Sequence, residues 1–139
     1  MARINPGIRP QTMTLSFSIL SQGFAIARLE PEAGVPDAVL ASREFMSVTR
    51  TDDELSIVCS EDAAAGLSKV DRHWRAIRIH GPFAFDQTGV LAAFLDPLAS
   101  ACIGIFAVST FDTDYVLVKS DNLESAVQAL QAAGHRFVA

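Results

Sequence analysis

Residues 109–114 bring together several side chains that could recognise a small charged molecule. The segment offers hydroxyl groups, an aromatic ring and two carboxylates in close succession. A carboxylate that accepts from an ammonium group makes a charge-assisted hydrogen bond, which is stronger than a neutral one. The segment could therefore hold the amino group of a zwitterion. Its aspartates could instead bond only their own backbone in a turn, which is the role that we prefer for Asp112. The candidates are Ser109, Thr110, Phe111, Asp112, Thr113 and Asp114.

A second group of candidates stands at the start of a predicted helix, at Thr88, Gly89 and Val90. Glycine lets a ligand approach the backbone closely, and the first turn of a helix presents free N–H groups to an anion. A ligand carboxylate could therefore bind to the N–H groups of Gly89 and Val90. The alternative is that Thr88 or Asp86 only caps the helix, and for Asp86 we prefer this simpler role.

The charged segment 49–54 is the counterpart of residues 109–114 in the first half of the chain. Its Arg50 could hold a carboxylate through two parallel hydrogen bonds. We prefer the alternative, a solvated turn, because Asp52, Asp53 and Glu54 form an acidic run of the kind that is common on protein surfaces.

Other kinds of chemistry find little support in the sequence. The three histidines, His73, His80 and His135, have no metal-ligand spacing with one another or with a cysteine. Asp112 and Asp114 could chelate a divalent ion, but two carboxylates are a weak signal. The glycine patterns of phosphate and dinucleotide loops and the serine of a nucleophile elbow are absent. We therefore predict that the protein is not an enzyme and needs neither a cofactor nor a metal.

The composition restricts the possible partners. The chain has 139 residues, 50% of them hydrophobic, and a net charge of −5. An acidic chain without a run of lysine or arginine offers no surface for nucleic acid or an anionic membrane. The longest uncharged stretch is broken by glycine and serine, and no apolar segment of a secretory signal follows the N-terminal residues. With two isolated cysteines in apolar runs, these features predict a cytoplasmic protein, and the high apolar content predicts a homodimer or a larger homo-oligomer.

The chain contains an internal repeat. Residues 47–58 align without a gap with residues 107–118, and each copy predicts a strand, an acidic turn and a strand. The same offset places Phe17 and Ile19 on Ile77 and Ile79. We therefore predict a loose arm at 1–11, a first unit at 12–68, a link at 69–73 and a second unit at 74–139.

Hydrophobic periodicity predicts the elements of both units. The second unit has the order strand, helix, strand, strand, helix, strand. This is a ferredoxin-like βαββαβ arrangement, with an antiparallel sheet and both helices on one face. The first unit is a degenerate form of it, so the fold class is α+β. In the first unit we expect strands at 15–19 and 24–29 joined by a turn at 21–23, a helix at 37–42, strands at 45–50 and 55–59, and a short helix at 61–66. In the second unit we expect strands at 77–79, 103–110, 115–119 and 136–138, and helices at 88–101, with a kink or restart at Pro97, and at 121–133, before Gly134.

Three segments, 45–59, 74–82 and 106–118, resemble a group of small bacterial tandem ACT-domain proteins. The run from Ser109 to Tyr115, followed by an apolar strand, carries most of the resemblance. The resemblance implies two ACT folds paired side by side, and a small ligand, typically an amino acid, bound at an interface between ACT units. It also implies a regulatory role, as in the regulatory parts of aspartate kinases and in the cytosolic arginine sensors of animals.

In those arginine sensors an acidic residue at the position of Asp114 recognises the ligand, so the resemblance makes Asp114 our first choice for the ammonium group. The first unit departs from the family because the usual glycine-containing turn into its first helix is absent between residues 20 and 36. The competing interpretation is a structural module of the same fold that binds a protein partner and no small ligand.

Overall fold

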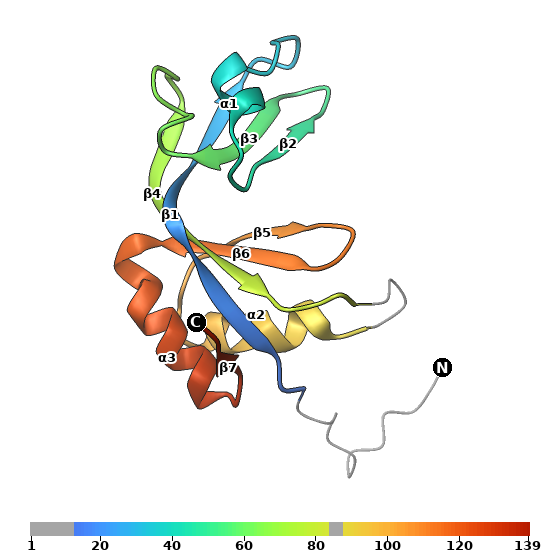
Figure 1. The fold of residues 1–139 in the computed structure, drawn as a ribbon, viewed down its shortest axis with the longest axis vertical. Coiled ribbons are helices and arrows are strands. Elements are labelled where there is room, and N and C mark those ends of the chain that lie inside the picture. The colour runs from blue at the N-terminus through green and yellow to red at the C-terminus, as the bar shows by residue number, and fades with distance from the viewer. Residues whose placement is uncertain (1–12, 84–87) are drawn as a thin grey trace.

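The structure is a computed structural model and describes residues 13–83 and 88–139. Its strands form one curled sheet in the order β2-β3-β1-β4-β6-β5, with β7 paired to β1. Helices α2 and α3 pack on one face of the lower part of this sheet, and α1 lies at its upper end (Figure 1). The elements are β1 (Ser16–Leu29), α1 (Asp37–Ala41), β2 (Ser47–Arg50), β3 (Leu55–Ser60), β4 (Val70–Ile79), α2 (Val90–Ser100), β5 (Phe106–Ser109), β6 (Asp114–Lys119), the 3₁₀ turn η1 (Ser120–Asn122), α3 (Leu123–Ala132) and β7 (Arg136–Phe137).

Strands β1 and β4 form a long antiparallel ribbon that runs through both halves of the molecule. Phe17 lies opposite Ile79 at one end of the ribbon, and Ala27 lies opposite Val70 at the other end. Each half then adds its own hairpin, β2–β3 beside β1 and β5–β6 beside β4. The two halves are therefore joined by shared strands rather than by a linker.

This ribbon corrects two expectations from the sequence. The turn at residues 21–23 is wrong, because β1 continues through these residues as one strand of 14 residues. The turn-forming residues lie instead in an irregularity of the pairing just before Gly23. The link expected at 69–73 lies mostly within β4. In both places a local pattern typical of a loop is overridden by strand pairing across the ribbon.

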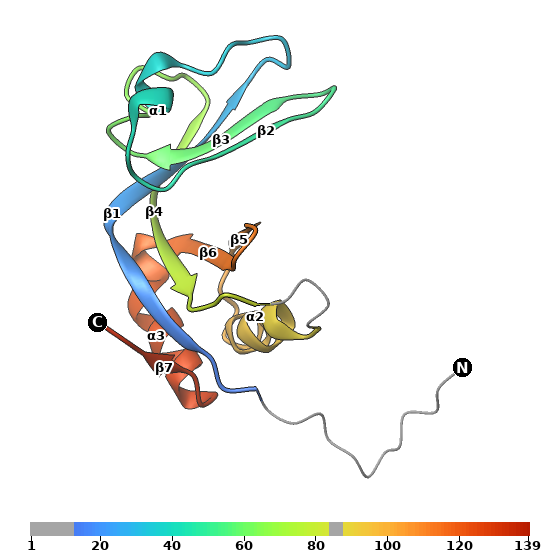
Figure 2. The same ribbon diagram turned by 45° about the vertical axis from the view of Figure 1, so that its right-hand side comes forward.

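Two irregularities bend the ribbon. The pairing of β1 with β4 shifts just before Gly23 and again just before Ile26. Opposite the second shift, His73 has a left-handed backbone with φ of 68°, which costs on the order of 1 kcal/mol for a residue with a side chain. The Glu61 carboxylate supports this conformation by accepting from the His73 N–H at 2.7 Å. Bulges increase the local twist of a sheet, and the two hairpins here curl toward each other on one side of the ribbon (Figure 2).

The two hairpins correspond to the predicted repeat, but the gapless alignment is wrong by one position. Leu55 closes the first turn opposite Arg50, and Asp114 closes the second turn opposite Ser109. Leu55 is therefore the counterpart of Asp114, whereas the sequence offset places it on Tyr115. A shift of one residue in a strand exchanges its two faces, so this correction decides which side chains of the hairpin face the helices.

The sequence alignment also assigns the wrong counterparts within the ribbon of β1 and β4. Ala27 lies opposite Ile57, and Ile77 lies opposite Val116, the counterpart of Ile57. Ala27 is therefore the counterpart of Ile77, and the offset wrongly assigned Phe17 to that place. The physical reason is that the connection from ribbon to hairpin is longer in the second half, where it contains α2, so no constant offset can hold along the whole chain.

Three clusters of buried side chains hold these layers together. Helices α2 and α3 cover one face of the second half, and α1 with the turns at 61–66 covers the same face of the first half. The uncovered faces of both halves meet in a third cluster of Phe24, Val58, Ala76 and Leu117. Phe45 from the first half also packs on Tyr115 from the second, with ring centroids 4.3 Å apart. The bend is therefore fixed by apolar contacts as well as by strand pairing.

The remaining elements differ from the sequence-based bounds in detail. The helices expected at 37–42, 88–101 and 121–133 are present but shorter, and Pro97 lies inside α2 without ending it. The strands expected at 45–50 and 103–110 are shorter as well. The helix expected at 61–66 is a series of turns, because so short a segment gains too few hydrogen bonds to offset helix nucleation.

His135 connects the ends of the second half. Its ring is 4% exposed, and Nδ1 accepts from the Leu15 N–H at 3.1 Å while Nε2 lies 2.9 Å from the Ala93 carbonyl oxygen. Because Nδ1 is an acceptor, the proton must be on Nε2, which donates to Ala93. The neutral His135 ring therefore provides a hydrogen-bond partner for the Leu15 N–H, just before β1, and for the Ala93 carbonyl oxygen in α2.

We expect His135→Ala to lower the free energy of unfolding by about 2–4 kcal/mol, because it leaves a cavity and two buried backbone groups without partners. Urea denaturation followed by circular dichroism measures the loss. Arg136→Ala is the matched control, since Arg136 is exposed and should change stability by no more than about 0.5 kcal/mol. An equal effect of both substitutions would contradict the role given to the ring.

Candidate functional site

The turn between β5 and β6 is built largely by its own threonines. The Thr110 N–H donates to the Thr113 carbonyl oxygen at 2.7 Å, and the Thr110 hydroxyl donates to the same oxygen at 3.0 Å. The buried Thr113 hydroxyl donates to the Ile79 carbonyl oxygen and so anchors the turn on β4. The hydroxyls of Thr110 and Thr113 are thus engaged within the protein, and a ligand would have to compete with these bonds.

Ser109 and Asp114 stand opposite each other at the base of this turn. The Ser109 hydroxyl donates to the Asp114 carboxylate. Because side chains alternate along a strand, Asp114 is on the same face of β6 as the buried Val116, which is the face that α2 and α3 cover. Phe111 and Asp112, at the tip, are exposed. Of the two candidate carboxylates, Asp114 is therefore the one held in place beside the helical layer.

The start of α2 has the features of an anion site. Gly89 is the N-cap residue with φ of 80°, and among the residues that the structure describes no side chain makes a capping hydrogen bond to this end. Helix α2 also lacks an acidic residue in its first turn, so its N–H groups and dipole favour a negative charge. The side chain of Val90 is buried in the core, which leaves only its N–H for a ligand. Asp86 lies outside the described residues.

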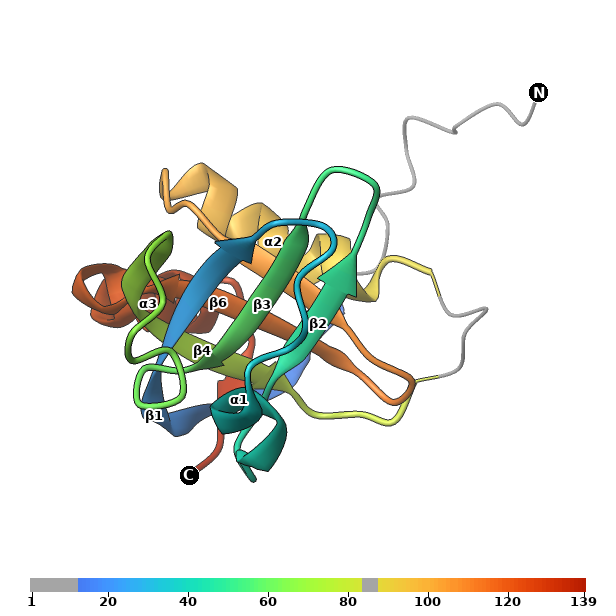
Figure 3. The same ribbon diagram turned by 90° about the horizontal axis from the view of Figure 1, so that it is seen from above.

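Seen from above, the start of α2 and the β5–β6 turn lie at the same end of the second half (Figure 3), as they do in Figure 1. The structure thus brings the two predicted groups, residues 88–90 and 109–114, to one side of the molecule. Together the two groups match the two ends of a zwitterion, because residues 88–90 present N–H donors for a carboxylate and Asp114 presents a carboxylate for an ammonium group.

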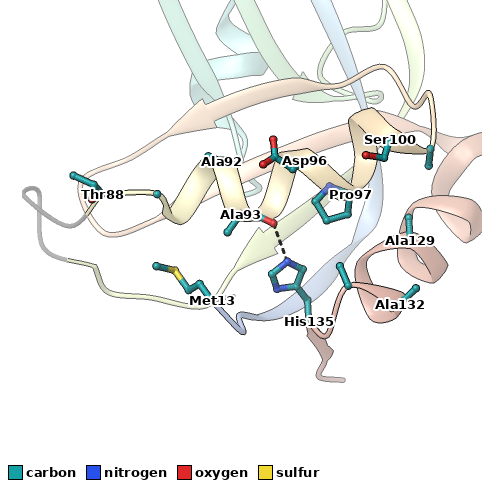
Figure 4. Close-up of a pocket in the computed structure, with 13 residues that line it drawn as sticks. Met13, Thr88, Ala92, Ala93, Asp96, Pro97, Ser100, Ala129, Ala132 and His135 are labelled. Atoms are coloured by element: carbon teal, nitrogen blue, oxygen red, sulfur yellow. Dashed lines mark hydrogen bonds between the residues drawn. The ribbon is translucent and has the colours of Figure 1, made fainter. Parts of the chain in front are cut away.

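A broad groove runs along the outer faces of α2 and α3 (Figure 4). It has a volume of about 930 Å³, Thr88 and Gly89 lie at one end, and His135 lies in its floor. Six of its thirteen lining residues are alanines, which lie in α2 and α3 or directly after these helices. The start of α2 therefore opens toward this groove as well as toward the hairpin.

The sequence analysis missed a second concave surface, which we call the inter-hairpin cleft. It lies on the face opposite the helices and consists of two cavities of about 420 and 260 Å³ that share Ser56 and Phe106. Ser47 and Thr49 of β2 also line it, on the same strand face as Ser56. The alternating hydroxyls were visible in the sequence, but what faces them depends on the bend of the ribbon, which no local pattern reports.

The first-half turn at 49–54 has a structural role. Arg50 donates to the carbonyl oxygens of Pro31 and Ala33, and the Thr51 N–H donates to the Glu54 carbonyl oxygen at 2.9 Å. The Arg50 guanidinium is therefore committed to the loop that precedes α1, a structural role that the sequence did not indicate.

The three histidines make separate contacts. His73 lies 3.3 Å from Glu61, His80 lies 2.8 Å from the Ser18 hydroxyl, and His135 is bonded within the core. Within residues 13–83 and 88–139 there is no group of three or more His, Cys, Asp or Glu that could hold a metal ion. No helix in the same ranges is long and apolar enough to cross a membrane.

Comparison with known proteins gives this arrangement a family. The family model of the ACT domain matches residues 69–132, and a second model, for an N-terminal domain, matches residues 22–66. The solved structure of protein Atu0741 from Agrobacterium tumefaciens is 42% identical, with a TM-score of 0.84, over 91% of this chain and 93% of that chain. The chain belongs to the ACT-domain family. The predicted α+β fold class is confirmed.

Other proteins that resemble the chain are a sensor and a regulatory subunit. The cytosolic arginine sensor for mTORC1 subunit 1 is 42% identical in Pongo abelii and 26% identical in Rattus norvegicus, in each case over 92% of this chain. The ACT chain covers only 40% of the length of these curated relatives. The regulatory subunit of aspartate kinase from Thermus thermophilus shares the fold, with a TM-score of 0.63 at 13% identity over 89% of this chain and 99% of that chain.

A polar cluster lies near the bend of this ACT protein. The Asp71 carboxylate accepts from the Lys119 ammonium group and from the Trp74 Nε1–H, the latter at 2.9 Å. The Lys119 ammonium also lies 5.0 Å from the centroid of the Trp74 ring. The hydrogen bond from Lys119, followed by the one from Trp74, lowers the pKa of Asp71 below its usual value of 3.8.

We expect the contacts of Asp71 to weaken when the solution is made acidic and to stay unchanged near neutral pH. Because the folded-state pKa of Asp71 is lowered, its stabilising effect is complete above the unfolded-state pKa and is lost as the pH falls through the folded-state pKa. Trp74 is the one tryptophan of the chain, so its fluorescence should stay constant from pH 7 to about 4 and change below that. Asp71→Asn should remove the transition, and a transition centred near neutral pH would contradict the assignment.

Gly81, just after β4, lies directly against the backbone of the turn between β5 and β6. A Cβ at Gly81 would lie 2.7 Å from the main-chain oxygen of Asp112, so the backbone would have to move. We expect Gly81→Ala to cost about 1–3 kcal/mol of unfolding free energy, measured by urea denaturation. Gly104→Ala, where a Cβ would meet no atom within 4 Å, is the control and should change stability by less than about 1 kcal/mol. A similar loss of unfolding free energy in both variants would contradict this prediction, because it would show that the turn moves at little cost.

Proposed function

We propose that this ACT chain is a non-catalytic regulatory module that binds an amino acid or a similar small zwitterion. The observation that carries the proposal is the arrangement at one end of the second half, where the start of α2, at which no described side chain makes a capping hydrogen bond, and the Asp114 carboxylate lie on the same side of the sheet. The relation to the cytosolic arginine sensors supports a ligand that carries both an ammonium and a carboxylate group.

The chemistry of the two groups suits such a ligand. The N–H groups of Gly89 and Val90 and the dipole of α2 would hold the ligand carboxylate. The Asp114 carboxylate, already oriented by the Ser109 hydroxyl, would accept from the ligand ammonium group in a charge-assisted hydrogen bond. Thr88, Thr110, Phe111, Asp112 and Thr113 would complete the surroundings of the ligand.

We further propose that the molecule contains two ACT units that share the ribbon of β1 and β4 and otherwise correspond to 12–68 and 74–139. The first unit is reduced, and the protein acts as a cytoplasmic homodimer. Apart from the buried Val90 and Thr113 and the half-buried Asp114, the candidate residues are exposed, so an ACT unit of a second copy can approach them. A ligand bound between units would favour the closed arrangement by population shift, and the effect on an unidentified partner protein would follow from that shift.

A second candidate function has its own observation. The alanine-lined groove of about 930 Å³ along α2 and α3 is large and apolar, as expected for a surface that binds another protein. In that case the chain would be a structural interaction module without a small ligand, and amino acids would leave its stability unchanged.

The test is thermal denaturation and calorimetric titration of the protein with each common amino acid, beginning with L-arginine. A ligand that binds only the folded state should raise the melting temperature, with a stabilisation of about 2.7 kcal/mol at a hundredfold excess over its dissociation constant. We expect Asp114→Asn to weaken binding at least tenfold, because a charged hydrogen bond contributes about 1.5–3 kcal/mol.

Asp52→Asn is the matched control. It removes the same charge from an exposed position in the first-half turn and should leave the affinity unchanged. Equal affinity of the Asp114→Asn variant and the unmodified protein would remove Asp114 from the site. No stabilisation with any amino acid would favour the interaction module.

A further inference from the structure

We propose that the groove along α2 and α3 binds residues 1–12 of the same chain, which we call the N-terminal segment. This inference does not rest on the proposed function, because it needs neither an amino acid nor Asp114. It also differs from the second candidate function. The occupant of the groove would be part of the chain itself, and a partner protein would first have to displace it.

The groove favours a mainly apolar occupant that carries positive charge. Apart from Thr88, Ser100, Asp96 and His135, its lining residues are alanine, glycine, methionine and proline. Asp96 is the one acidic residue among the described residues that line it, and it forms no salt bridge with another described residue. Soluble proteins rarely leave a large apolar surface uncovered, so a groove of about 930 Å³ with these walls calls for an occupant.

The N-terminal segment has the matching composition. Arg3 and Arg9 are its charged residues, and it contains no aspartate or glutamate. Ile4, Ile8 and two prolines supply apolar surface. The charge of the segment is opposite in sign to that of the chain as a whole, which is −5. Electrostatic attraction therefore holds the segment near the rest of the protein, and its isoleucines provide the apolar groups that the groove lacks.

Met13 leads the segment directly into the groove. It is the first residue that the structure describes, and it lines the groove near the end at which Thr88 lies (Figure 4). Helix α2 has 11 residues, and at 1.5 Å per residue it is about 16 Å long. About five extended residues span that length, at roughly 3.3 Å each. Residues 8–12 are therefore long enough to run from Met13 along α2 to Ser100.

The order of residues in the segment fits the groove as well. Pro10 favours an extended backbone at Arg9, and the side chains of an extended chain alternate between two sides. When Ile8 points to the alanines of the groove, Arg9 points to its rim. The Asp96 carboxylate is exposed and lies at that rim, directed away from His135 (Figure 4). One arrangement would thus bury Ile8 and pair Arg9 with Asp96.

Occupancy would control access to the groove. A partner protein or a second copy would reach the walls of the groove only after displacing the segment. The apparent affinity for such a partner is then reduced by the fraction of molecules in which the groove is covered. The segment would therefore act as a built-in competitor for this surface.

The experiment measures whether residue 5 comes close to the far end of the groove. A nitroxide is attached at Asn5→Cys in the full chain, and the exposed Cys102 is replaced by serine, whereas Cys59 is buried and is kept. The unpaired electron broadens the resonances of nearby amides. We expect no broadening in α1, which lies at the other end of the molecule (Figure 1). We expect strong broadening at the far end of the groove, at Ser100, Ala101 and Ala133.

Substitutions separate the apolar contact from the charged one. Ile8→Asp should reduce the broadening roughly fivefold or more, because a buried isoleucine is lost. Arg9→Glu and Asp96→Arg should each reduce it about twofold, because an exposed ion pair contributes little. The two charge reversals combined should restore it. Arg43→Glu is the matched control, since it reverses an exposed charge in the first half and should leave the broadening unchanged.

Three outcomes would overturn the proposal. Broadening confined to the residues next to Met13 would show that the segment leaves the groove open. Broadening at Ser100 that persists in both the Ile8→Asp and the Arg9→Glu variant would show that the segment is near the groove without binding it. The third outcome comes from a mixture of nitroxide-labelled protein and isotope-labelled protein without nitroxide. Broadening in that mixture equal to that within one chain would assign the groove to the segment of a neighbouring copy.

Discussion

The antiparallel pairing of β1 with β4 is the interaction on which the other layers depend. Each hairpin needs one of these strands as its neighbour, and the helical layer packs on their apolar face. The irregularities within the pairing then set the direction of both hairpins. A bulge costs regular hydrogen bonds and, at His73, backbone strain. The molecule offsets this cost with the Glu61 carboxylate and with the apolar contacts between Phe45 and Tyr115.

The sequence predicts most of the elements but not the way in which they share strands. Alternation at Ile77 and Ile79 and the helical spacing of Leu91, Phe94 and Leu98 are local signals, and the corresponding strand and helix are present. Residues 21–23 carry an equally clear turn signal, yet they continue a strand. The difference arises because β1 pairs with β4 before and after these residues, at Ile19 with Ile77 and at Gly23 with Arg75, and these partners are more than fifty positions away in the sequence.

For the candidate site, too, the sequence predicts the local features but not those that depend on distant pairing. Residue types at 88–90 and 109–114 indicated donors for a carboxylate and an acceptor for an ammonium group, and the fold brings both groups to one end of the second half. The sequence did not reveal that Thr113 is consumed by its bond to Ile79, or that the register of the repeat is displaced by one residue. That displacement places the side chain of Asp114 on the helical face, a feature that only the pairing of β5 with β6 determines.

The shared ribbon also has a consequence for how the chain folds. The partners Phe17 and Ile79 are far apart in the sequence, so their pairing closes a long loop and carries a large entropic cost before any gain. Proteins dominated by such distant pairings have high contact order and fold slowly. Neither half possesses a complete sheet until the other has contributed its strand, so a stable intermediate with one half formed has little to support it. We therefore expect the protein to unfold in one cooperative transition, although its sequence contains two repeated units.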